Sequence, residues 1–131
     1  VCDLHANSHK LLAVNAVARS MLTQADAVIA LANANPIALA RILREIHELR
    51  ALRTSSESIH VVFNRLMTKT PQPPEVAAFV ELTKLPAPMT IRDDHDAFEM
   101  LVARASTKAT LRKRSAYKTD IQALTDKVLG L

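Results

Sequence analysis

The chain has 131 residues, of which 49% are hydrophobic and 23% are charged, and this is enough for one domain with a substantial apolar core. A single cysteine, Cys2, can form no internal disulfide, which favours a reducing, cytoplasmic compartment. The composition excludes a disulfide scaffold, a collagen-like chain and a disordered one, and no apolar run reaches the roughly 20 residues of a membrane span.

Glycine is almost absent, since Gly130 is the only one where a chain of this length holds about nine. Neither GxGxxG nor GxxxxGK[ST] can be written with it, so the chain carries no glycine-rich phosphate loop. With no Trp, one Tyr and three Phe, it also lacks the aromatic residues of a stacking platform for single-stranded nucleic acid.

The first half of the chain alternates between strand and helix signals. The opening VCDL is typical of the end of a buried strand, with Asp3 at its tip, and an Ala-rich, well-buried helix is expected over 11–23. In ADAVIALAN only apolar residues stand between Asp26 and Asn33, which is typical of a strand covered on both faces. A helix follows over 36–52, because its apolar residues recur with a 3.6-residue period.

Asn35 is expected to cap this helix and Pro36 to be its first residue. The run SIHVVFNRL predicts the next strand, and a helix is expected to begin at Pro74.

The remaining signals predict a short strand and two helices. APMTIR is the strand, and a helix capped by Asp93 or Asp94 follows it, with Phe98, Leu101 and Val102 facing inward. The last helix is expected over 115–129. Its apolar seam comprises Tyr117, Ile121, Leu124, Val128 and Leu131.

This order predicts an α/β fold, a doubly wound and mostly parallel sheet with helices on both faces, in one domain over residues 1–131. Ligands of such sheets bind beyond the carboxyl ends of the strands. Polar residues stand at all four expected strand ends, namely Asp3, the turn 33–35, Asn64 with Arg65, and Arg92 with Asp93.

Two clusters resemble metal sites. His5 and His9 are four residues apart, as zinc ligands on a helix can be, but their segment is typical of a loop and contains no CxxC or HExxH, so we favour solvated histidines and expect no metal. Asp93, Asp94 and Asp96 invite a metal or acid–base interpretation, but acids in a first helical turn more often cap the helix and interact with its dipole.

A basic run extends from Arg104 to Lys118, with six cationic residues and no acid. Through Arg112, Lys113 and Arg114 it could contact DNA phosphates or an anionic membrane, although a solvated basic face is the commoner case. The last helix lacks Phe and Trp, so membrane insertion is only weakly supported.

Three stretches together resemble the ParA/MinD family of P-loop ATPases, and most closely the CpaE/TadZ-like branch of pilus-assembly systems. They are QADAVIALANANPIALARILREIHELR, IHVVFNRL and LPAPMTIRDDHDAFEMLVAR, which follow the order and spacing of the family over nearly the whole chain. The resemblance implies a partial P-loop NTPase fold, the carboxyl-terminal half of the domain, with the phosphate-binding strand upstream of Val1.

The resemblance also implies roles for individual residues. Asp3 matches the switch-strand carboxylate that holds a magnesium-bound water, and Asn64, followed by Arg65, matches the amide that bonds the adenine edge. Arg92 and Asp93 match the loop beside the base. ATP and Mg²⁺ are therefore expected only for the complete protein, and this chain by itself should hydrolyse no ATP.

A complete protein of this kind would form a homodimer around the nucleotide, bind a protein of a secretion or partition system, and position a pilus, a chromosome or plasmid, or a septum. Two positions depart from the family pattern, His5 after Asp-Leu and Arg92 before Asp93. Together with the missing glycines, they motivate one alternative, a non-enzymatic α/β interaction module that keeps the fold without nucleotide chemistry. The basic run motivates another, a basic DNA-binding module.

Overall fold

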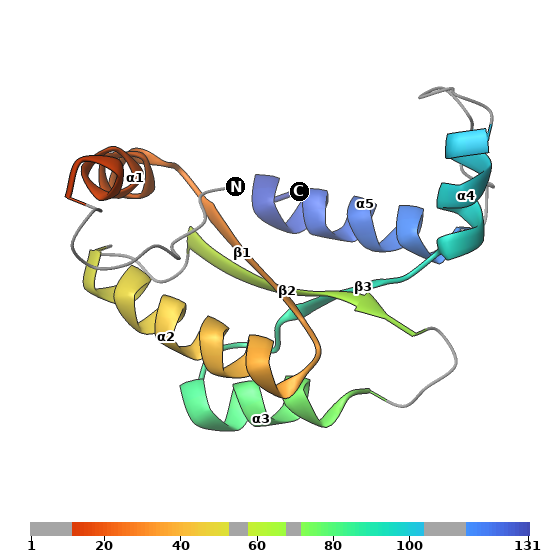
Figure 1. The fold of residues 1–131 in the computed structure, drawn as a ribbon, viewed down its shortest axis with the longest axis horizontal. Coiled ribbons are helices and arrows are strands. Elements are labelled where there is room, and N and C mark those ends of the chain that lie inside the picture. Colours follow the sequence, from red (N-terminus) through yellow and green to blue (C-terminus); the bar gives the residue numbers. More distant parts are fainter. Residues whose placement is uncertain (1–11, 53–57, 68–71, 104–114) are drawn as a thin grey trace.

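The computed structural model describes residues 12–52, 58–67, 72–103 and 115–131 (Figure 1). The strand expected over residues 1–4 lies outside these ranges. The helices and strands are, in chain order, α1 (Leu12–Gln24), β1 (Val28–Asn33), α2 (Pro36–Leu52), β2 (Ile59–Leu66), α3 (Pro74–Thr83), β3 (Met89–Arg92), α4 (His95–Ala103) and α5 (Ala116–Leu129).

The three strands form one parallel sheet in the order β1-β2-β3. α2 connects β1 to β2 and α3 connects β2 to β3. Because parallel crossovers are right-handed and the chain moves across the sheet in one direction, both helices lie on the same face (Figure 1). The expected parallel α/β architecture is thus confirmed for the described residues.

Local signals explain where α2 begins. The Asn35 side chain accepts a hydrogen bond from the Ala38 backbone N–H through Oδ1, at 2.8 Å, and Pro36 is the first helical residue. This cap satisfies one of the donors that a helix N-terminus leaves free. The expected cap and the expected helix over 36–52 are both confirmed.

The main core lies between the sheet and the pair α2 and α3. Phe63 of β2 and Phe79 of α3 are fully buried at its centre, with ring centroids 5.7 Å apart in an edge-to-face arrangement. The other buried members are Val28, Ala30, Ile42, Ile46, Leu49, Val61, Leu66 and Val76.

The opposite face of the sheet carries α5, which packs on β3 (Figure 1). Side chains alternate along a strand, so Val62 of β2 points away from the main core. Its register partner Met89 lies on the same face, as does Ile91 two residues further on. Val62 and Ile91 are both buried. Helices therefore cover both faces of the sheet.

Cover of β1 on both faces, which the apolar run predicted, is not observed among the described residues. Val28 and Ala30 are buried under α2, but Ile29 is 48% exposed and Leu31 is 50% exposed on the other face. β1 is the edge strand of the described sheet, and α5 lies over β3 at the opposite edge.

The burial expected of α1 is not observed, since Val17 is 63% exposed and Met21 is 58% exposed.

Three further expectations about apolar residues are wrong. Phe98 of α4 is 39% exposed, and the side chain of Leu101 lies outside the described ones. Val102 is exposed because α4 lies beyond the end of β3, away from the main core (Figure 1). Leu131 is exposed because α5 ends at Leu129, and Gly130, at φ 71°, turns the chain out of the helical period.

Candidate functional site

The carboxyl ends of the three strands form one polar edge, which we call the carboxyl edge and define as Asn33, Asn64, Arg65, Arg92 and Asp93. Asn33 and Asn64 are register partners at the ends of β1 and β2, so their side chains project from neighbouring strands. The structure thus brings together the polar strand ends that the sequence predicted, as far as they are described.

Asn64 is half-buried and its side chain is oriented by a local hydrogen bond. Its Oδ1 accepts from the backbone N–H of Arg65 at 2.9 Å. A carboxamide has two further donors on Nδ2 and a second lone pair on Oδ1. For Nδ2, the described residues supply no hydrogen-bond acceptor, so Asn64 can offer these groups to a ligand at the carboxyl edge.

Arg65 has a left-handed backbone, with φ 59°, and the register of β2 against β3 shifts between Phe63 and Leu66. An irregularity of this kind inserts one residue and re-aims its side chain. Arg65 is exposed, while Leu66 returns to the core. The sequence carried no signal for this bulge, because a non-glycine residue at positive φ is uncommon.

The end of β3 is tied to the end of β2. The backbone N–H of Asp93 donates to the Leu66 carbonyl at 2.8 Å. This bond continues the pairing of the two strands beyond the bulge and places the half-buried Asp93 beside the Asn64–Arg65 corner.

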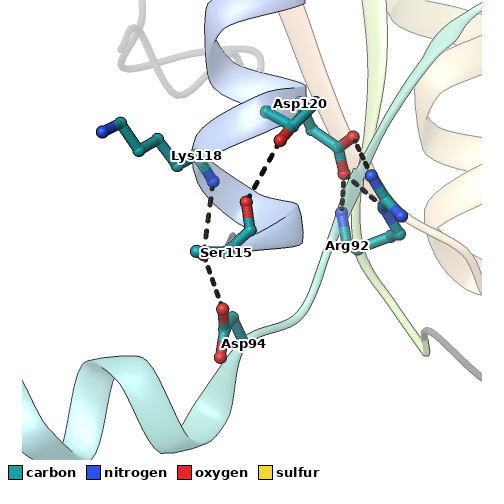
Figure 2. A network of polar contacts seen from close by, with 6 residues as sticks. Arg92, Asp94, Ser115, Lys118 and Asp120 are labelled. Atoms are coloured by element: carbon teal, nitrogen blue, oxygen red, sulfur yellow. Dashed lines mark hydrogen bonds and ion pairs between the residues drawn. The ribbon is translucent and has the colours of Figure 1, made fainter. Parts of the chain in front are cut away.

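Arg92 is held by Asp120 of α5 (Figure 2). Its Nε and backbone N–H both donate to Asp120 Oδ2 at 2.9 Å, and its Nη2 donates to Oδ1 at 2.7 Å. This is a bidentate, charge-assisted pair. The resemblance had implied a place for Arg92 beside a base. In the structure its guanidinium joins α5 to β3.

The pair shifts the ionisation of both partners. Burial alone would raise the pKa of Asp120, but hydrogen bonds from the side chain and backbone of Arg92, together with its charge, leave that pKa below its ordinary value of 3.8. The hydrogen bond to Asp120, with its negative charge, raises the pKa of Arg92. Both groups are therefore fully charged at neutral pH.

A second polar link lies beside this pair and joins two helix N-termini (Figure 2). The buried Ser115 hydroxyl donates to Asp94 Oδ2 at 2.6 Å and accepts from the Lys118 backbone N–H at 3.4 Å, which caps α5. Asp94 Oδ1 accepts from the Ala97 N–H at 3.3 Å and so caps α4. The capping interpretation is confirmed for Asp94.

Several candidates lie outside the described residues. These are Asp3, His5, His9 and the three central cations of the basic run, Arg112, Lys113 and Arg114. Within the described ranges, no three His, Cys, Asp or Glu side chains come together as a metal site. The described helices include none whose length and apolar character would let it cross a bilayer.

No protein-family model, curated protein or solved structure shows a significant match to the chain. Chemically, the carboxyl edge combines an oriented amide, an exposed guanidinium and a carboxylate at the ends of parallel strands. These groups can donate to and accept from a polar ligand, and Arg65 can pair with an anion.

Proposed function

We propose that the chain is the carboxyl-terminal part of a ParA/MinD-like ATP-binding switch domain. In the complete protein ATP and Mg²⁺ would bind at the carboxyl edge, with Asp3 at the magnesium and the adenine on Asn64. The protein would form a homodimer around the nucleotide and position a cellular structure through a protein partner. The sheet would then be part of a larger doubly wound P-loop fold.

The observation that carries the proposal is the state of Asn64. Its amide is oriented by the Arg65 N–H and faces the edge where open α/β sheets bind ligands. A carboxamide in this position has the donor and acceptor pattern that recognises an adenine edge. Asp93, hydrogen-bonded across to Leu66, is the neighbouring group that could contact the same base.

The experiment is a calorimetric titration of MgATP into the full encoded protein, with and without Asn64→Ala. The variant should bind ATP about fivefold to tenfold more weakly, because it loses about one hydrogen bond of about 1 kcal/mol.

Gln122→Ala is the matched control. It removes an exposed amide on α5 whose Nε2, among the described residues, donates to Asp126 of the same helix. Its ATP affinity should equal that of the unchanged protein. The absence of saturable ATP binding by the full protein would refute the proposed function. Equal weakening by both variants would refute the place of Asn64.

The second candidate, an α/β interaction module without nucleotide chemistry, is favoured by one observation. Arg92 is engaged by Asp120 and serves to hold α5 on the sheet. In such a module the polar groups near β3 would be scaffold only, and the titration above would show no heat of binding.

A further inference from the structure

α5 is held to the sheet in a different way from α2 and α3. α2 contributes three buried residues and α3 contributes two, but α5, which is described along its whole length, contributes none. Its apolar residues Tyr117, Ile121, Leu124 and Val128 are only half-buried. Helices draw most of their stability from the apolar face that they bury.

The N-terminal half of α5 is held by hydrogen bonds to the rest of the structure and not by buried apolar side chains. Asp120, with a side chain 14% exposed, receives three hydrogen bonds from Arg92 of β3. One turn earlier, the buried Ser115 hydroxyl bonds Asp94 at the start of α4 (Figure 2). Both links join α5 to the segment 92–94, so the helix is fastened at one end.

The other half of α5 has weaker attachments. Leu129 is exposed, and the cap at Gly130 bonds only to carbonyls of α5 itself. Beneath the helix lies β3, whose Ile91 is buried on that face of the sheet. Release of α5 would therefore uncover Ile91 without opening the main core, which lies between the opposite face and α2 with α3.

We propose that α5 is a detachable helix, fastened by the Arg92–Asp120 and Asp94–Ser115 links. It opens as one unit ahead of the core formed by β1 to β3 with α2 and α3, and its release uncovers Ile91 of β3. This inference is independent of nucleotide binding. It follows from the uneven distribution of buried apolar contacts, since elements with few of them open first.

The test is amide hydrogen exchange of the full chain at neutral pH, read by mass spectrometry on peptides from α2 and from α5. In the unchanged protein α5 should exchange at least tenfold faster than the central turns of α2. Asp120→Asn should accelerate exchange throughout α5 by about thirtyfold, because it weakens the link that holds this helix to β3.

Asp126→Asn is the matched control, since it alters an acid on the same helix whose side chain, among the described residues, bonds Gln122 of α5. It should leave α5 exchange within about twofold of the unchanged protein. Ser115→Ala should act like Asp120→Asn. Equal protection of α5 and α2 in the unchanged protein, or unchanged exchange of α5 in Asp120→Asn, would overturn the proposal.

Discussion

Replacing Phe79 by alanine is expected to lower the free energy of unfolding by about 3–5 kcal/mol. The ring is fully buried, packs edge-to-face against Phe63, and joins α3 to the central strand. Its removal leaves a cavity between α3 and β2, which the packed core around it cannot fill. A domain of this size has about 5–15 kcal/mol of stability in total, so urea unfolding should show a large fall in the midpoint.

Phe98→Ala is the control for this substitution. Phe98 also pairs edge-to-face with an aromatic ring, that of Tyr117 at 4.8 Å, but it is 39% exposed and lies on α4, outside the main core. We expect a loss of about 1 kcal/mol. If Phe98→Ala destabilised the protein as much as Phe79→Ala, the position of the core between the sheet and α2 with α3 would be contradicted.

The second large effect is on the free energy of unfolding of Asp120→Asn and on its pH dependence. Asp120→Asn should cost about 2 kcal/mol of unfolding free energy at pH 6. Bonds to a charged group are worth about 1.5–3 kcal/mol, and the figure allows for the solvent exposure of Arg92. The cost should disappear in strong acid. The folded pKa of Asp120 lies below 3.8, so its contribution is present above that pH and is lost as the pH falls through the folded value.

Urea unfolding of both proteins between pH 6 and pH 2 measures this difference directly. The two stabilities should stay apart by a constant amount down to about pH 4 and converge below 3.8. A difference that stayed constant to pH 2, or that grew toward acid, would show that the carboxylate of Asp120 does not stabilise the fold through Arg92.

Features that depend on residues close together in the chain could be predicted from the sequence. The 3.6-residue period over 36–52 and the Asn35–Pro36 pair gave α2 with its correct start, because capping and periodicity act within a few residues. The apolar runs predicted β1, β2 and β3, and the helices between them predicted that the strands are parallel.

Features that depend on partners far apart in the chain could not be predicted from the sequence. The position of Arg92 is decided by Asp120, 28 residues later, and nothing in either local pattern marks the pair. The link between Asp94 and Ser115 spans 21 residues and was likewise missed, although each was expected near a helix start. The exposure of Ile29 and Leu31 depends on where α5 lies, which an apolar run cannot show.

The two proposals for this chain concern different parts of the structure and can fail separately. Nucleotide binding rests on the carboxyl edge, chiefly Asn64. Detachment of α5 rests on the Arg92–Asp120 and Asp94–Ser115 links and on the sparse burial of that helix. Hydrogen exchange tests the second in the absence of any nucleotide.

The central claim is that MgATP binds at the carboxyl edge, and nuclear magnetic resonance of the ¹⁵N-labelled full protein tests it most directly. On titration with MgATP, we expect saturable shifts that include the amides of Asn64, Arg65 and Asp93, and little change in the middle of α2. Absence of saturable shifts, or shifts that spare the ends of β2 and β3, would contradict the claim.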